Sequence, residues 1–335
     1  MPAPERIPAG RVTTPTAGPA AQGPADGVRT DAGQADAGRT DAGRTDVKEL
    51  ITHGELTVRG RIREASNAVL YCSVSYDGRT AHCVYKPVAG ERPLWDFPDG
   101  TLAQREVAAY EVSEATGWGL VPPTVLREGP YGEGMCQLWI EPAEAAASAG
   151  NAGDDGEDAA PGGDAGGADD DAPAVTPLLA LVEDDEPGDG WKAVGFAEVG
   201  EGRTALLVHA DDARLRRLAV LDAVINNGDR KGGHLLPAPG GRLYAIDHGV
   251  TFNVDDKLRT LLWGWAGEPL TEEALDVLAR LEDALADGAP LATRLAELIT
   301  PAETDAVRSR VRDLRHTGRH PEPSGQWPAI PWPPV

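Results

Sequence analysis

The sequence predicts an α+β fold of two lobes, in which a small antiparallel-sheet lobe with one helix precedes a mainly helical lobe. Three observations predict it. Before residue 141, the sequence contains several short segments typical of strands, two of which are joined by a tight turn. After residue 191, apolar residues recur at helical spacing, with one short hairpin among them. An acidic tract of low hydrophobicity separates the two parts, as expected for a solvated connection.

In the first lobe, residues 47–62 predict a short helix followed by a strand. The strings "AVLYCSVSYDG" and "TAHCVYKPV" predict two strands that a "YDG" turn joins into a hairpin. Residues 102–116 predict a helix, because Thr101 and Gln104 form a capping box and Gly117 is placed to end it. The string "MCQLWIE" predicts one more strand of the same lobe.

In the second lobe, "ARLRRLAVLDAVINN" predicts a helix whose apolar face also contains Asp222. Short strands in "HLL" and "LYAID" flank the turn "PAPGG" and form a hairpin. Two later helices are expected over 271–286 and 301–315. The second has a strong start signal, with Thr300 as N-cap and Glu303 three residues later.

Composition divides the 335-residue chain into five segments. Residues 144–190 hold fourteen Asp or Glu and no Lys or Arg, so they contribute −14 of the net charge of −23. The Pro-, Gly- and Ala-rich start with its short repeats cannot bury a core. We therefore expect a disordered tail over 1–46, the first lobe over 47–141, an acidic disordered insertion over 142–190, the second lobe over 191–320, and an irregular tail over 321–335. Inside the insertion, the apolar stretch 175–182 is a candidate contact with the folded body.

The composition also excludes several classes of protein. No basic face of the kind that binds nucleic acid is visible, and no apolar run is long enough to span a membrane. The N-terminus has no apolar signal-peptide core, and the three cysteines form no CxxC pair. We expect a cytoplasmic protein with reduced, buried thiols and without a nucleic-acid partner or a membrane span.

The stretch "NNGDRKGGH", residues 226–234, concentrates polar groups between two apolar segments. Asp229 falls on its loop, His234 begins the following strand, and Asp247 ends the second strand of the hairpin. Because a hairpin brings its two ends together, we expect His234 and Asp247 to be neighbours, with Asp229 close by. Mg²⁺ prefers oxygen ligands and shares them with phosphate, which suits Asp247. A carboxylate at 229 suits the orientation of an attacking hydroxyl group.

Two charged residues of the first lobe complete the constellation. Lys86 ends an apolar strand, and Glu106 lies on an apolar helix face. Because buried charges are usually paired, we expect an anionic partner for Lys86 and a cationic partner for Glu106. A strand lysine followed by a helix glutamate is the pair that positions nucleotide phosphates in kinases.

Together with "NNGDRKGGH" and "IDHG", these residues resemble the phosphatidylinositol 3-/4-kinase-like superfamily. That superfamily includes the HipA-type bacterial kinases, with an "NxDRxxxN" loop and a "DxG" metal motif. The strings "YKPVAGERPLWDFPDGTLAQREVAAYE", "AVLDAVINNGDRKGGHLL" and "DHGVTFN" are also similar to an actinobacterial family with a kinase-like domain. The resemblance covers about 50–140 and 191–270. It implies a protein-kinase-like fold and a phosphotransferase that depends on ATP and a divalent metal.

The resemblance also implies roles. Lys86 would hold the α- and β-phosphates of ATP, Glu106 would orient that lysine, and Asp229 would be the catalytic carboxylate. The loop "EASNAV" falls where such kinases keep a phosphate-covering turn, so Ser66 and Asn67 would donate hydrogen bonds to phosphate. The string "QLWIE" falls where the hinge meets adenine.

The metal position departs from the family pattern. Asp247 would bind the metal, but the second metal ligand, an Asn in the pattern, is His234 here. Imidazole suits Mn²⁺ better than Mg²⁺, so the cofactors implied are ATP with Mg²⁺ or Mn²⁺. The acceptor of the phosphate is open among a protein, a lipid head group and a small molecule.

Three other functions stay open. The altered metal position is compatible with a nucleotide-binding pseudokinase scaffold that has lost catalysis. The same fold could also perform nucleotidyl transfer. A metal-dependent hydrolase could use a zinc cluster of His209, His234 and His248.

Purely structural interpretations also stay open at the loop. The "NNG" string could be only a helix C-cap, and Asp229 could form a structural ion pair with Arg230, which we interpret as a brace of the loop. Lys257 and Arg259, after the metal segment, could meet an anionic substrate.

Overall fold

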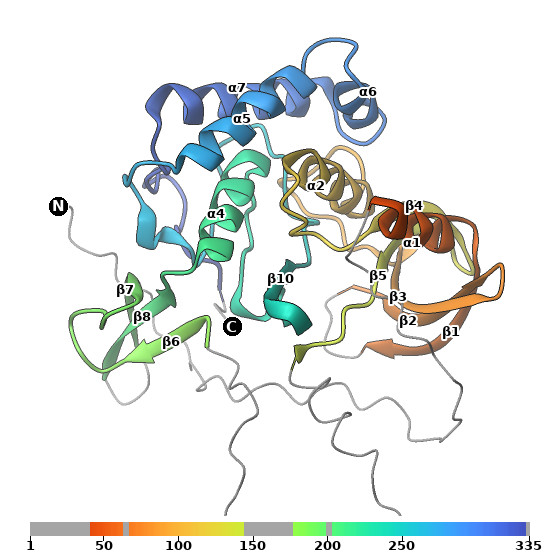
Figure 1. The fold of residues 1–335 in the computed structure, drawn as a ribbon, viewed down its shortest axis with the longest axis horizontal. Coiled ribbons are helices and arrows are strands. Elements are labelled where there is room, and N and C mark those ends of the chain that lie inside the picture. Colours follow the sequence, from red (N-terminus) through yellow and green to blue (C-terminus); the bar gives the residue numbers. More distant parts are fainter. Residues whose placement is uncertain (1–40, 63–66, 144–176, 199–202, 333–335) are drawn as a thin grey trace, which may run out of the picture.

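The computed structural model describes residues 41–62, 67–143, 177–198 and 203–332 (Figure 1). It confirms the predicted α+β fold, because a sheet forms the first lobe and helices dominate the second. None of the helices in these described ranges combines the length and the apolar composition that a membrane crossing needs.

The first lobe is built on a five-stranded antiparallel sheet with the order β1-β2-β3-β5-β4. The predicted hairpin of β2 and β3 is confirmed, and its turn places Asp77 and Gly78 at φ of 49° and 73°. Two consecutive positive φ values are typical of a type I′ turn, for which Asp-Gly is a preferred sequence. The strands are β1 (Glu55–Ile62), β2 (Val69–Tyr76), β3 (Arg79–Pro87), β4 (Thr124–Gly129) and β5 (Gly132–Leu138).

Helix α1 (Asp41–His53) packs Leu50 and Ile51 onto this sheet, against a buried cluster that includes the three free cysteines. Because the helix begins at Asp41, the expected disordered tail over 1–46 is wrong for its last six residues. Packing of one apolar face stabilises a helix over its neighbouring turns, even where the local composition is poor. Residues 1–40 lie outside the described part of the chain.

Helix α2 (Leu102–Thr116) begins and ends as predicted. Thr101 Oγ1 accepts a hydrogen bond from Gln104 N, Gln104 Oε1 accepts one from Thr101 N, and Gly117 ends the helix at φ 75°. The helix contacts β4 and β5 on one side and α4, α5 and α6 of the second lobe on the other (Figure 1). Its Val107, Ala108 and Val112 belong to the main buried core, so α2 is shared between the lobes.

The second lobe surrounds α4 (Ala213–Ile225), whose apolar face is buried as predicted and includes Asp222. The capping box of Thr300 and Glu303 at the start of α7 (Pro301–Thr317) is also confirmed. The remaining helices are α5 (Glu272–Ala284) and α6 (Pro290–Ala296), of which the second is not in the sequence prediction. The predicted hairpin is formed by β9 (Leu235–Ala238) and β10 (Arg242–Ala245).

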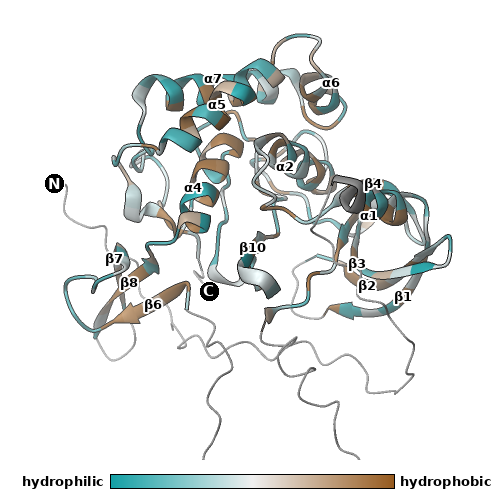
Figure 2. Ribbon diagram, viewed as in Figure 1, coloured by the Kyte–Doolittle hydropathy of each residue, from teal (hydrophilic) through white to brown (hydrophobic). Residues whose placement is uncertain are grey.

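The second lobe also carries a three-stranded sheet that the sequence analysis does not predict. Its order is β6-β8-β7, with β6 (Leu179–Val182), β7 (Trp191–Glu198) and β8 (Thr204–Ala210). The expectation of disorder across 142–190 is therefore wrong at β6, which is hydrophobic along its length (Figure 2) and pairs with β8. Pairing satisfies the backbone of this apolar stretch, and Leu178 and Leu179 pack against the main core. Residues 144–176 lie outside the described ranges.

The tail after residue 320 contains neither helix nor strand as far as residue 332. It nevertheless packs on the body, because the carbonyl oxygen of the buried Ala329 accepts hydrogen bonds from Thr260 N at 3.1 Å and Trp263 Nε1 at 2.8 Å.

Candidate functional site

Lys86, near the end of β3, contacts carboxylates from two other elements. Its Nζ lies 2.7 Å from Glu106 Oε1 on α2 and 2.9 Å from Asp247 Oδ1, two residues beyond β10. The structure thus brings together a strand lysine, a helix glutamate and the aspartate of the "IDHG" string. Glu106 is buried and Lys86 is largely buried, whereas the Asp247 side chain is half exposed.

The electrostatics of this cluster favour a charged lysine and an ionised aspartate. Burial lowers the pKa of Lys86, but the charges of Asp247 and Glu106 outweigh it and raise the pKa above its ordinary value. The charge of Lys86 lowers the pKa of Asp247 well below its usual range. For Glu106, burial raises the pKa while the charge of Lys86 opposes that rise. The lysine therefore keeps its proton, and its ammonium group pairs with both carboxylates.

The β9–β10 hairpin brings His234 to Asp247, as the spacing predicts. His234 Nε2 lies 3.4 Å from Asp247 Oδ2, and the backbone N of Ile246 donates to the carbonyl oxygen of His234. Burial lowers the pKa of His234 to about 4, so its imidazole is neutral near pH 7. Its Nδ1 accepts a hydrogen bond from Lys231 N at 3.5 Å, so binding of a metal at Nε2 would require the tautomer with the ring proton on Nδ1. Asp247 has a φ of 61°, a left-handed conformation that is uncommon outside glycine and clusters at functional sites.

Asp229 lies on the loop after α4, with its side chain about a quarter exposed. Its backbone N donates to Asn227 Oδ1, and Asn227 Nδ2 donates to Asp222 Oδ1, so α4 fixes the loop. Burial raises the pKa of Asp229, and the charge of Asp247 also raises it, so the two carboxylates are close enough to interact. Lys231 Nζ pairs with Asp229 at 3.0 Å.

The structural alternatives for this loop have different outcomes. Asn226 does end α4 in the left-handed conformation, so the C-cap interpretation is correct and coexists with the polar cluster. The proposed ion pair of Asp229 with Arg230 is wrong, because Arg230 pairs with Asp222 at 2.9 Å with both side chains fully buried. The interpretation of Arg230 as a brace of the loop is confirmed.

The expected phosphate-covering turn is only partly described. Ser66 lies outside the described residues. Asn67 Oδ1 accepts a hydrogen bond from Arg92 N at 3.0 Å, which ties this turn to the loop that precedes α2.

Lys257 and Arg259 differ in their surroundings. Lys257 Nζ pairs with Asp96 at 2.8 Å and lies 4.1 Å from the ring centroid of Trp327, so its charge is neutralised and covered. The expectation that Lys257 meets an anionic substrate is therefore wrong. Arg259 is partly exposed, and its charge acts on Asp229, whose pKa it lowers against the effect of burial.

A zinc cluster of three histidines is not formed. His209 Nε2 accepts from Gly264 N at 3.1 Å and His209 Nδ1 lies 2.9 Å from Ala210 O, so both ring nitrogens already have partners. Within the described part of the chain, no group of three His, Cys, Asp or Glu side chains could hold a metal ion. A metal at Asp247 and His234 would therefore need further ligands from phosphate or water.

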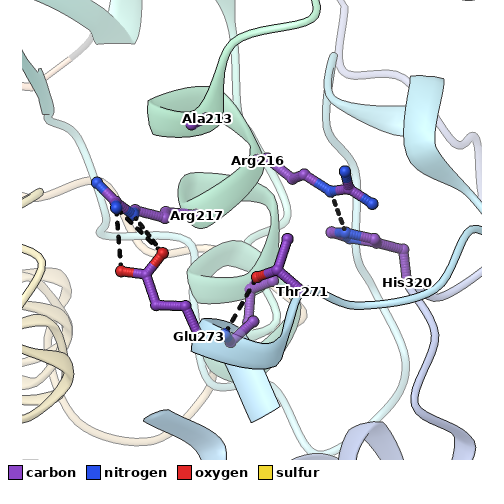
Figure 3. A pocket seen from close by; sticks show the side chains of 8 residues that line it. Ala213, Arg216, Arg217, Thr271, Glu273 and His320 are labelled. Carbon is purple, nitrogen blue, oxygen red and sulfur yellow. Dashed lines mark hydrogen bonds and ion pairs between the residues drawn. The ribbon is translucent and has the colours of Figure 1, made fainter. Parts of the chain in front are cut away.

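A small pocket between α4 and α5 lies apart from these residues (Figure 3). Its walls carry the pair of Arg217 with Glu273 and the contact of Arg216 with His320. None of the predicted site residues within the described ranges lines it.

Fold and site together define an α+β protein in which a sheet lobe and a helical lobe meet at the Lys86–Glu106–Asp247 cluster. The chain is 48% identical over 285 residues to Protein Rv2133c of Mycobacterium tuberculosis, covering 85% of this chain and 94% of that protein. It belongs to the family of that protein. No protein-family model matches the sequence.

Solved structures with a similar fold include three at 12% identity. They are the Golgi casein kinase (TM-score 0.46, 84% of this chain and 75% of that chain), a hydra Fam20 with sugar (0.42, 84% and 89%) and the Helicobacter pylori proinflammatory kinase CtkA (0.39, 80% and 94%). All three TM-scores are below 0.5, so the roles of the site residues depend on the geometry described above.

Proposed function

We propose that the protein is an ATP- and divalent-metal-dependent phosphotransferase of protein-kinase-like fold, with motifs of the phosphatidylinositol 3-/4-kinase-like superfamily. The observation that carries the proposal is the position of Lys86, whose ammonium group bridges Glu106 on α2 and Asp247 after β10. In kinases, a strand lysine is paired with a helix glutamate, and a nearby aspartate holds the metal that neutralises phosphate charge.

Each residue then has a role that its surroundings support. Lys86 keeps its proton and would bind phosphate oxygens, while the buried Glu106 restricts where the ammonium group can lie. Asp229, whose pKa burial raises, would orient the acceptor hydroxyl group and accept its proton late in the transfer. Asn67, which precedes β2, would donate to phosphate together with Ser66.

Asp247 and His234 fit a divalent metal as a minimal pair of ligands. One carboxylate and one neutral imidazole lie within 3.4 Å of each other, and the half-exposed carboxylate leaves room for phosphate oxygens and water. A nitrogen ligand favours Mn²⁺ over Mg²⁺. When bound, the metal would neutralise charge on the phosphates. Because Lys86 occupies Asp247 Oδ1, the lysine must release that oxygen as the nucleotide enters.

The test is ADP release from ATP by the full chain, with Mg²⁺ and with Mn²⁺, before and after removal of metal with EDTA. We expect metal-dependent turnover that Lys86→Met and Asp247→Asn each abolish. Lys48→Met is the matched control, because Lys48 of α1 also pairs with a glutamate of α2, Glu111 at 3.3 Å. Full turnover in both Lys86→Met and Asp247→Asn would contradict the proposal.

A second candidate is a nucleotide-binding scaffold without turnover. The observation that favours it is His234 at the metal position, with no third protein ligand among the described residues. ATP would then raise the melting temperature without ADP release, since a ligand that binds only the folded state stabilises it. Release of pyrophosphate in place of ADP would instead indicate nucleotidyl transfer. The acceptor remains open among protein, lipid head group and small molecule.

The domain boundaries and the cytoplasmic location stay predictions. We propose that residues 47–141 and 191–320 act as the two kinase-like lobes.

A further inference from the structure

A buried chain of polar contacts runs from α4 to the Lys86–Glu106 pair. Arg230 has no exposed side-chain surface and donates to both carboxylate oxygens of Asp222, each at 2.9 Å. It also donates to the carbonyl oxygen of Ile246 at 3.0 Å. Its Nη2 lies 2.7 Å from His248 Nε2. Since a guanidinium group cannot accept a hydrogen bond, Nε2 is the acceptor and the ring proton of a neutral His248 is on Nδ1.

His248 joins this chain to the glutamate. Its backbone N donates to Glu106 Oε2 at 2.9 Å, while Glu106 Oε1 accepts from Lys86. The buried His248 Nδ1 has no hydrogen-bond partner among the residues that the structure describes, and it lies 4.0 Å from the same Glu106 Oε2. His248 therefore contacts Arg230 through its ring and Glu106 through its backbone.

The backbone at Asp247–His248 is held at three points, by a residue of α2, a residue of the loop after α4 and a residue three positions further along the chain. The nitrogen of His248 is bound by Glu106, its ring by Arg230, and its carbonyl oxygen by Thr251 Oγ1 at 2.7 Å. These contacts restrict rotation of the peptide that carries Asp247, whose left-handed φ needs such support.

We propose that His248 is a positioning residue, and that the buried Asp222–Arg230 pair fixes it so that Glu106 and Asp247 face Lys86 together. This inference rests on the proposed function. A buried ion pair is weak evidence for stability, because desolvation offsets most of the attraction between the charges. The arrangement is better explained by the position it imposes on His248, as outer-shell partners orient the groups that contact a ligand.

Two substitutions at one position separate positioning from packing. His248→Leu removes the acceptor for Arg230 and keeps a side chain of comparable size, whereas His248→Gln keeps an acceptor. We expect His248→Leu to lower kcat about 10- to 100-fold, with a smaller change in KM for ATP, and His248→Gln to restore most of the loss.

A second readout does not depend on turnover. Lysine acylation followed by mass spectrometry measures the labelling rate of Lys86 against that of Lys48 in the same sample. Lys86, held by two carboxylates, should label slowly in the wild type and faster in His248→Leu. If the wild type releases no ADP with either metal, the proposed function fails, and the labelling ratio still decides this inference.

The folded state of each variant is checked by urea unfolding. If His248→Leu does not fold, Thr251→Val replaces it, since that change deletes only the bond to the carbonyl oxygen of His248 and should also speed Lys86 labelling. A folded His248→Leu, or Thr251→Val in its place, with wild-type labelling of Lys86 would overturn the proposal. A His248→Gln variant as impaired as His248→Leu would overturn it too, because a restored acceptor would then have no effect.

Discussion

Acid should destabilise the folded protein through His209. This side chain is fully buried between β8 and the turn Trp263–Trp265, where Nε2 accepts from Gly264 N and Nδ1 donates to Ala210 O. Only the neutral imidazole satisfies both contacts, because a proton on Nε2 would face the N–H of Gly264. Burial accordingly lowers the pKa of His209 to about 4.

The magnitude follows from linkage between protonation and folding. Since the folded pKa lies below the ordinary value of about 6.5, the unfolded chain takes up the proton first as the pH falls. The stability present above pH 6.5 is therefore lost as the pH decreases toward 4. At about 1.4 kcal/mol per pH unit, His209 removes about 2 kcal/mol of unfolding free energy by pH 5 and about 3 kcal/mol by pH 4.

Urea unfolding at pH 7, 6 and 5 tests this in the wild type, His209→Gln and His316→Gln. Glutamine can still accept from Gly264 N but does not titrate, and His316 provides a matched change at an exposed position of α7. Between pH 7 and 5, the wild type and His316→Gln should each lose about 2 kcal/mol more than His209→Gln. An equal loss in all three proteins would refute the assignment to His209.

Three further substitutions test contacts that support the fold. Thr300→Ala removes the N-cap acceptor of α7 and should cost about 1 kcal/mol of unfolding free energy; an unchanged urea midpoint would contradict this. Gly264→Ala would place a Cβ 2.3 Å from Lys192 Cβ, so we expect a loss of about 3 kcal/mol by urea unfolding; a wild-type midpoint would show that the turn can shift. Glu303→Gln leaves the buried Arg105, 2.6 Å away, without its charged partner and should cost about 3 kcal/mol or more, against no change for the exposed Asp305→Asn. Equal midpoints for these last two variants would refute the role of the pair.

Local signals predicted the parts of the fold that depend on neighbouring residues. The capping boxes at Thr101 and Thr300 and the Asp77-Gly78 turn each involve residues within three positions of one another, so the sequence displays them directly. Strands β4, β7 and β8 were missed because each needs a partner strand to satisfy its backbone, and pairing is not visible in one segment. Strand β6 was missed for a different reason, since the acidic residues around it dominate the composition of that segment.

Two parts of the site were predictable from the sequence: the charged pair of the first lobe and the contact between the two ends of the β9–β10 hairpin. Lys86 and Glu106 stand on apolar elements and therefore need each other, and the β9–β10 hairpin had to bring His234 to Asp247. The position of Asp222 on an apolar helix face is a signal of a buried partner, but no local pattern identifies that partner as Arg230. The pairing of Lys257 with Asp96 left no local signal, because the two residues are 161 positions apart.

Helix α2 determines how the two lobes can move. Its apolar residues belong to the core of the second lobe and its Arg105 is tied to Glu303 of α7, so the helix must travel with that lobe. The sheet, which α2 contacts only on its other side, is then the body that shifts. Hinge motion would shear β3 past α2, and the Lys86–Glu106 hydrogen bond spans that sliding surface. Opening and closing would therefore break and remake the hydrogen bonds of Lys86 to Glu106 and to Asp247, which both join the sheet to that lobe.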